Sequence, residues 1–257
     1  MSAAQDAGPS TTIVFLHHFG GSARSWDHVI GRLRADYGCV APDLRGFGDA
    51  SQAGGPYSIA RYADDVADLL ARLDLERCVL VAHSMGGKIA LAFAAQRPPG
   101  LVGLVLLAPS PPTPEPMSDT DRARMLAAHG DREAALAIIT RITARPLSAA
   151  LIACTADDML RSSGQAWAAW LEHGSREDLF LADETLSLPA LVVSGTLDNT
   201  IPTGVIAREV MPRLGLASLV TVAGSGHLLP VEAAGETSEL IRSFLAKPMG
   251  GNKGARP

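Results

Sequence analysis

The fold is decided by the stretch CVLVAHSMGGKIALAF, residues 78–93. Its valine-rich start, residues 78–82, predicts a buried strand, and residues 86–96 predict a helix. Between them, Ala82-His-Ser-Met-Gly86 places Ser84 in a tight turn, with a small residue two positions before it and two after it. Such a turn projects a serine hydroxyl from the edge of a sheet in a strained backbone conformation. The stretch therefore predicts that Ser84 is a nucleophile; the alternative is a serine that only caps the following helix.

Strands and helices alternate on both sides of this stretch. Short apolar runs predict strands over residues 12–16, 38–41, 78–82, 101–107, 190–194 and 219–223. Helical patterns lie between or after them, over residues 25–37, 59–73, 86–96, 203–213 and 232–245. Nearly continuous apolar strands that alternate with helices are typical of a parallel sheet covered on both faces. We therefore expect an α/β fold with a mainly parallel sheet of about six strands, flanked by helices.

The alternation stops at Ala108–Met117, where five prolines in ten residues exclude regular structure. The following residues show only helical patterns, near 119–129, 131–143, 147–161 and 164–173. This predicts an all-helical cap inserted at residues 115–185 into a core formed by residues 1–114 and 186–247. The tail, residues 248–257, has little apolar surface to bury and is expected to be disordered.

Composition and charge narrow the classes of partner. The chain has 257 residues, of which 47% are hydrophobic, and a net charge of −5 from 22 basic and 27 acidic residues. No basic block stands out, which argues against a nucleic-acid or membrane partner and favours a small molecule. The first residues have neither a basic start nor an apolar stretch of the length typical of a signal peptide, and no run of about 18 uncharged apolar residues occurs, so a cytoplasmic location is expected. The oligomeric state is left open.

The cysteines argue against a disulfide framework and against a metal site. There are three, Cys39, Cys78 and Cys154, and they are far apart in the chain. Cys39 and Cys78 each lie in an apolar run, so we expect both to be buried core thiols.

A serine hydroxyl needs a base, which is usually histidine. Of the seven histidines, His227 lies in a Gly-rich loop directly after the last predicted strand. Active sites of open α/β sheets lie at this end of the strands, where such a loop can swing a histidine over the serine. His83 should point away from the Ser84 hydroxyl. Three other histidines are expected to lie on the surface or on helices rather than in the site: His28, His129 and His173.

The base needs an acid, and the best candidate is Asp198 in Gly195-Thr-Leu-Asp-Asn-Thr-Ile-Pro. It follows a predicted strand and precedes His227, which gives the chain order Ser, acid, His. The alternative is an aspartate that only begins the next helix. Other aspartates fall in or near the predicted cap, a poor place for a rigid partner: Asp157, Asp158, Asp178 and Asp183.

Acyl transfer also needs donors for the oxyanion. The backbone N–H of Met85 follows the nucleophile at the start of a helix, where the dipole assists. The second donor is expected from His17-His-Phe-Gly-Gly21 after the first strand, with Phe19 as our choice. The alternative for this segment is a plain Gly-rich turn.

Five motifs in this order carry a resemblance to a known family: FLHHFGGSARSWDHVI, APDLRGFGDAS, VAHSMGGKIAL, LVVSGTLDNTIP and GSGHLLPVE. Together they resemble the α/β-hydrolase superfamily, and more narrowly its small, capped serine esterase-like members. The resemblance implies ester hydrolysis through an acyl-enzyme without a cofactor, and a cap that acts as a lid and shapes the acyl pocket. The chain departs from the family pattern at Ala82 and His18, where glycine is usual. Only about a dozen residues precede the His17-His18 motif, where family members commonly have two or three strands, so we expect a sheet with fewer strands.

Position in the chain suggests residues that border the substrate pocket: His18, Met117, Met125, Trp167, Trp170 and Leu228. Trp167 and Trp170 share one face of a helix, and either line the pocket or anchor the cap to the core. Asp43 and Arg45 are expected to brace a loop, and Lys88 is expected to be a solvated helix residue.

The function predicted is therefore hydrolysis of carboxylic esters with small to medium acyl groups by a Ser84–His227–Asp198 triad. A carbon–carbon bond hydrolase, a lactonase, a thioesterase or a cofactor-free perhydrolase would use a similar triad. A lyase would use it as an acid–base device without acylation. A ligand binder without turnover has no chemical need for all three residues, and enzymes with an aspartate nucleophile do not fit Ser84.

Overall fold

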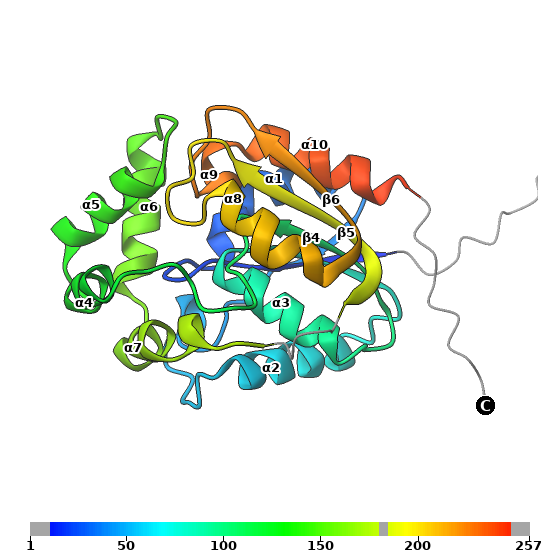
Figure 1. The fold of residues 1–257 in the computed structure, drawn as a ribbon, viewed down its shortest axis with the longest axis horizontal. Coiled ribbons are helices and arrows are strands. Elements are labelled where there is room, and N and C mark those ends of the chain that lie inside the picture. The colour runs from blue at the N-terminus through cyan, green and yellow to red at the C-terminus, as the bar shows by residue number, and fades with distance from the viewer. Residues whose placement is uncertain (1–10, 180–184, 248–257) are drawn as a thin grey trace, which may run out of the picture.

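The computed structural model describes residues 11–179 and 185–247 (Figure 1). The predicted disordered tail, residues 248–257, lies outside the described residues, as do residues 1–10 and 180–184 of the predicted core and cap.

Six strands of the described residues form one sheet, in the order β2-β1-β3-β4-β5-β6. Their bounds are β1 Thr12–Leu16, β2 Gly38–Val40, β3 Cys78–His83, β4 Leu101–Leu107, β5 Leu186–Gly195 and β6 Leu214–Val222. Each pair of neighbouring strands is parallel. The central strands β3 and β4 are buried along their whole length, as their apolar runs predicted. The prediction of an α/β fold with a mainly parallel sheet of about six strands is confirmed.

Helices cover both faces of the sheet (Figure 1). They are α1 Asp27–Leu33, α2 Ile59–Arg72, α3 Met85–Ala95, α8 Thr203–Val205, α9 Leu229–Glu232 and α10 Ala234–Leu245. Side chains alternate between the faces, so Val14 and Leu16 of β1 pack on the side of α2 and α3, whereas Ile13 and Phe15 pack on the side of α1 and α10. The shorter helical segments are η1 Ala23–Trp26, η2 Gly48–Ala50, η3 Gly174–Arg176, η4 Ile206–Val210 and η5 Met211–Arg213.

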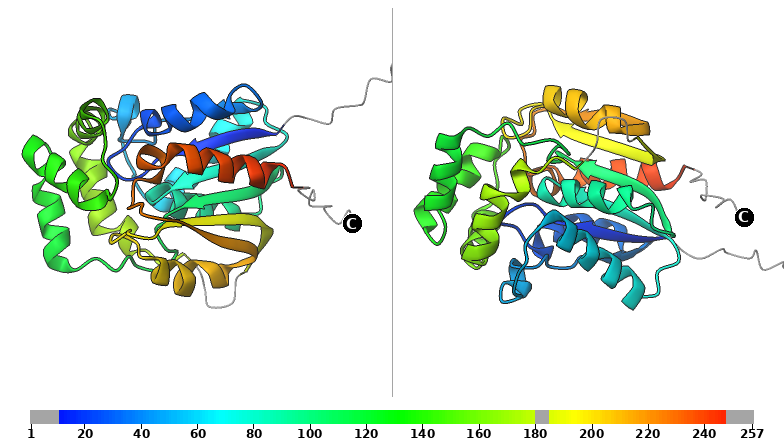
Figure 2. Two further views of the ribbon diagram at one scale, coloured as in Figure 1. Left: turned by 90° about the horizontal axis from the view of Figure 1, so that it is seen from above. Right: turned by 60° about the horizontal axis from the view of Figure 1, so that its bottom comes forward.

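The described helices between β4 and β5 are α4 Asp119–Ala127, α5 Arg132–Ile142, α6 Ala149–Leu160 and α7 Gly164–Glu172. We call them the cap. The side chain before each helix accepts hydrogen bonds from N–H groups of its first turn; these residues are Ser118, Asp131, Ser148 and Ser163. These N-caps fix the starts of the four helices, which lie within one or two residues of the predicted starts. Figure 2 shows the cap, in green, beyond one end of the sheet. Ser84 directly follows β3, and Asp198 lies three residues after β5.

Three predictions about local structure were inaccurate. Strands β5 and β6 begin earlier than expected, at Leu186 and Leu214. The start of β5 contains Pro189, which is unusual in a strand, and β6 lies at the edge of the sheet, where its first residues do not form a continuous apolar run. The helix expected over residues 203–213 is broken into α8, a π-helical turn and a 3₁₀ turn that contains Pro212. Cys39 is only half-buried because β2 lies at the edge of the sheet, whereas Cys78 is buried. None of the described helices has the length and apolar character needed to cross a membrane.

Candidate active site

Ser84 lies in a sharp turn between β3 and α3. Its backbone has φ +51° and ψ −116°, a conformation that is costly for a residue with a side chain. The turn also brings α3 very close to β1: a Cβ atom at Gly86 would lie 2.5 Å from the Leu16 carbonyl oxygen. Only glycine fits at this second small position. Ala82, at the first, is buried in the sheet between β1 and β4, where its methyl group is accommodated.

The structure brings together Ser84, His227 and Asp198, which are far apart in the chain. The Ser84 hydroxyl lies 2.9 Å from His227 Nε2, and His227 Nδ1 lies 2.8 Å from Asp198 Oδ2. The three side chains are nearly buried, since the residues are 7%, 4% and 6% exposed. The other oxygen, Asp198 Oδ1, accepts the backbone N–H groups of Thr200 and Ile201 at 2.8 and 3.0 Å.

This arrangement determines the direction of the hydrogen bonds. Asp198 Oδ2 accepts the Nδ1–H of His227, which leaves Nε2 with its lone pair toward Ser84. Nε2 can therefore accept the proton of the Ser84 hydroxyl as the oxygen attacks a carbonyl carbon. The backbone N–H bonds to Oδ1 hold the carboxylate in the orientation that this requires.

The two predicted oxyanion donors lie on the segments that follow β3 and β1. Met85 is the first residue of α3, where a backbone N–H has no acceptor within its own helix. In the described part of the chain, the N–H groups of Met85 and Phe19 have no acceptor. The Phe19 ring packs on Trp167, with ring centroids 4.3 Å apart, and this contact anchors the loop.

Comparison with known proteins identifies the family. Residues 13–240 match the sequence profile described as the alpha/beta hydrolase family. The chain belongs to the alpha/beta hydrolase family.

Individual proteins are also similar to this alpha/beta hydrolase. An uncharacterized protein of Mycobacterium tuberculosis is 38% identical over 101 residues, which are 39% of this chain and 30% of that protein, so the chain spans less than a third of that relative. A putative non-heme chloroperoxidase of Synechocystis sp. is 26% identical over 94% of this chain and 93% of its own. The structure of an esterase from Thermogutta terrifontis has a TM-score of 0.78 and 26% identity, and covers 95% of this chain and 92% of that one.

A cluster of buried histidines lies next to His227 in this alpha/beta hydrolase. His17 accepts the Leu44 N–H at Nε2 and bonds the His18 carbonyl through Nδ1, so both ring nitrogens are used. The His18 ring packs on the His83 ring, with centroids 4.9 Å apart. A Cβ atom at Gly21 would lie 2.5 Å from that His18 ring, so the bulk of His18 is accommodated by a glycine three residues later.

His83 does not bond the Ser84 hydroxyl, as expected. Its Nε2 instead lies 2.8 Å from the His227 carbonyl oxygen, to which Nε2–H donates. Burial lowers the pKa of His17 and of His83, and burial together with the neighbouring His17 and His227 lowers the pKa of His18 to about 3. The cluster therefore packs as neutral rings.

These neutral histidines predict a loss of stability in acid. Between pH 6.5 and 3 the unfolded chain binds a proton at His18 that the folded protein excludes, so the free energy of unfolding falls as the pH falls. At pH 5 we expect His18 alone to account for a loss of about 2 kcal/mol. Urea unfolding at pH 7 and pH 5 measures this loss, and His18→Gln should reduce it by that amount. His28→Gln, at an exposed site, is the control and should not change it; equal pH dependence in both variants would contradict the prediction.

The remaining predicted pocket residues lie in different surroundings. Met117 and Met125 line a cavity of about 310 Å³ together with residues 199–201, which directly follow Asp198. Trp167 and Trp170 are buried; the Trp167 indole N–H donates to the Met125 carbonyl, and both rings lie near Phe19. Leu228 is buried next to His227.

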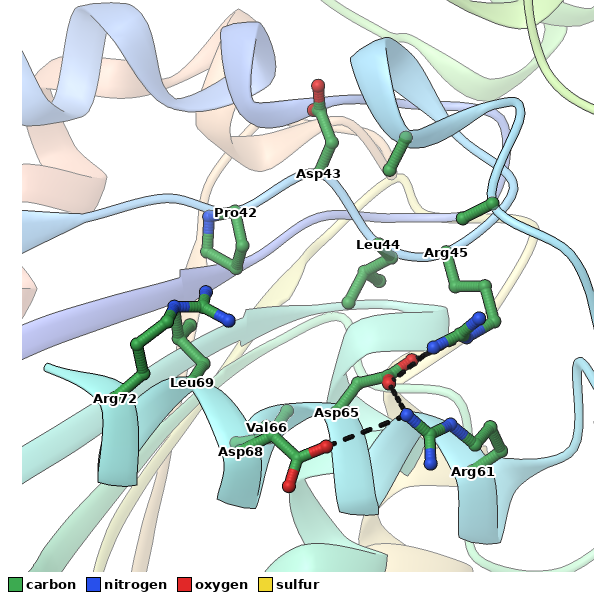
Figure 3. A pocket seen from close by; sticks show the side chains of 12 residues that line it. Pro42, Asp43, Leu44, Arg45, Arg61, Asp65, Val66, Asp68, Leu69 and Arg72 are labelled. Carbon is green, nitrogen blue, oxygen red and sulfur yellow. Dashed lines mark hydrogen bonds and ion pairs between the residues drawn. The ribbon is translucent and has the colours of Figure 1, made fainter.

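A second cavity, of about 320 Å³, is lined by several ion-paired side chains (Figure 3). Arg45 and Arg61 both point toward Asp65, with nitrogen–oxygen distances of 2.7 and 2.5 Å. Asp43 accepts the backbone N–H groups of Ala23 and Asp49, both at 2.6 Å. Asp43 and Arg45 thus brace the loop after β2, as expected. In the described residues, no group of three His, Cys, Asp or Glu side chains is arranged to hold a metal ion.

The prediction that Lys88 is solvated was wrong. Lys88 is 0% exposed, and its Nζ donates to the carbonyls of Thr113 and Glu177. Burial lowers the pKa of its amine to about 8. The two carbonyls belong to the segments that lead into the cap and out of it, and these segments cover the face of α3 that the sequence suggested was open to solvent.

Proposed function

We propose that this protein is a serine hydrolase that cleaves carboxylic esters with small to medium acyl groups. The observation that supports this most strongly is the hydrogen-bonded chain from Ser84 through His227 to Asp198, with Ser84 in a strained turn. A serine that only capped a helix would need neither the strain nor the buried histidine.

In the proposed reaction, Ser84 Oγ attacks the ester carbonyl while His227 Nε2 takes the hydroxyl proton. The N–H groups of Met85 and Phe19 stabilise the oxyanion. His227 then gives the proton to the leaving alcohol, and the acyl group remains on Ser84. A water molecule, deprotonated by His227, releases the acid and restores Ser84.

We further propose that the cap, with boundaries at residues 115–185, acts as a lid and shapes the acyl pocket. The support is the cavity between Met117, Met125 and the loop after Asp198. Leu228 and the two tryptophans form the apolar surroundings of the triad in this proposal, and the buried His18 ring supports the oxyanion loop from behind.

The test is a panel of p-nitrophenyl esters from acetate to octanoate, combined with labelling by a fluorophosphonate and mass spectrometry of the adduct. We expect turnover that is greatest for short or medium chains, and a label on Ser84 alone. If the folded protein hydrolyses no ester while Ser84 is labelled, the ester proposal is wrong, and a carbon–carbon bond hydrolase or a lactonase takes its place.

A second reaction on the same triad is favoured by the similarity to the putative non-heme chloroperoxidase over 94% of this chain. An acyl group on Ser84 that is attacked by hydrogen peroxide instead of water would give a peracid and free serine. Addition of hydrogen peroxide to the acetate-ester assay, with detection of peracetic acid, tests this reaction.

A further inference from the structure

The segment that connects α5 and α6 of the cap contacts the loops that carry His227 and Asp198. We call residues 141–145, at the end of α5 and after it, the connector. The Ile142 carbonyl accepts the backbone N–H of His227 at 2.8 Å. The Arg141 carbonyl accepts the side-chain amide of Asn199, next to Asp198, at 3.3 Å. The cap therefore contacts the loops that carry His227 and Asp198 through two of its backbone carbonyls.

Glu232 holds the connector from the other side. It is the last residue of α9, which begins two residues after His227. Its Oε2 accepts the backbone N–H groups of Ala144 and Arg145, both at 3.0 Å. The Arg145 guanidinium also donates to the Ala223 carbonyl and to Glu236, at 2.8 and 2.7 Å. A closed ring results: His227, the connector, Glu232 and α9, which leads back to His227.

The glycine before His227 allows this ring to close. A Cβ atom at Gly226 would lie 2.7 Å from the Ile142 carbonyl oxygen and 2.9 Å from the Ala144 nitrogen. It would also lie 3.1 Å from Glu232 Oε1. The backbones of the connector and the histidine loop thus approach more closely than any residue with a side chain would permit. The glycine serves this approach, whereas the sequence had suggested that it lets the loop swing.

We infer that Glu232 is a positioning residue for His227. Its carboxylate fixes the connector, and the Ile142 carbonyl then fixes the His227 backbone so that Nε2 stays in contact with Ser84 Oγ. Proton transfer depends steeply on this geometry, because a misplacement of about 1 Å costs on the order of 100-fold in rate. The inference rests on the proposed role of the triad, but not on which ester or other acyl compound is the substrate.

The test compares four variants of the full chain with wild type on p-nitrophenyl acetate. Glu232→Leu removes both oxygens, and we expect kcat to fall by about 30- to 100-fold with KM changed less than about threefold. Glu232→Asp keeps the charge but withdraws it by one methylene, and should lose about tenfold in kcat. Glu232→Gln keeps an acceptor oxygen in place and should recover to within about fivefold of wild type. Glu236→Gln is the matched control, because Glu236 contacts the connector through the Arg145 side chain and not through its backbone, and should remain within about twofold.

A wild-type kcat in Glu232→Leu, or a change in KM with kcat retained, would overturn the inference, since the connector would then only shape the pocket. If Glu232→Leu does not fold, Glu232→Asp takes its place: a kcat equal to that of wild type in this variant would likewise overturn the inference. The rate at which a fluorophosphonate labels Ser84 is measured in parallel, and we expect it to fall most in Glu232→Leu, less in Glu232→Asp and least in Glu232→Gln. If wild type hydrolyses no ester, the proposed substrate class fails, but this labelling rate still tests the role of Glu232.

Discussion

Ser84→Ala is expected to lower kcat for ester hydrolysis by about 10⁵- to 10⁶-fold, because it removes the hydroxyl that forms the acyl-enzyme in the proposed reaction. The His227–Asp198 hydrogen bond does not involve the Ser84 hydroxyl, so the base and its partner should stay in place and KM should change little. The measurement is the initial rate with p-nitrophenyl acetate, together with the loss of labelling by a fluorophosphonate.

Ser225→Ala is the matched control for this substitution. Ser225 is a buried serine two residues before His227, and its hydroxyl has no hydrogen-bond partner in the described residues. Its removal should leave kcat within about twofold of wild type. If Ser84→Ala keeps more than about 1% of the activity, after contamination by wild type is excluded, Ser84 is not the nucleophile.

Asp198→Asn is expected to lower kcat by about 10⁴-fold. The reason lies in how the carboxylate is held. Asp198 Oδ1 accepts two backbone N–H groups, so an asparagine will keep its oxygen there and turn its NH₂ group toward His227. That NH₂ donates to Nδ1 and forces the proton onto Nε2, which can then no longer accept the Ser84 proton. Stability and KM should change little, because the side chain keeps its shape and its backbone hydrogen bonds.

The pH–rate profile and the melting temperature are recorded with this variant. Asp157→Asn is the control: Asp157 is an exposed aspartate of the cap that pairs with Arg132, and its variant should be within about twofold of wild type. A loss of less than about tenfold in Asp198→Asn would show that the orientation of His227 does not depend on this carboxylate.

The approach of Ser84, Asp198 and His227 was predictable from the sequence for a physical reason. Each lies just after an apolar run, and the carboxyl ends of parallel strands meet at the same edge of a sheet. The helices of the cap were predictable from their helical patterns, and the structure adds that a serine or aspartate before each helix caps its first turn.

The features that were missed depend on contacts between distant segments. Lys88 stands on a helix whose composition says nothing about a cap that packs over it. Glu232 and the connector are about 90 residues apart, and the contact uses backbone N–H groups of Ala144 and Arg145, which leave no mark on residue type. The glycine at position 226 was noticed, but its neighbour in space, the Ile142 carbonyl, could not be inferred from the chain alone.

The burial of Lys88 has a consequence for recombination between related hydrolases. Its amine donates to the backbone carbonyls of Thr113 and Glu177, so these two hydrogen bonds depend on the path of the chain rather than on the residue types at these positions. If the cap of a related hydrolase replaced residues 114–176, Thr113 and Glu177 would remain from this protein, and both carbonyls would still accept from Lys88. A crossover outside them would bring a foreign chain path over a buried cation and leave it without acceptors. In a chimera of that kind, an apolar residue would have to replace Lys88 at the same time.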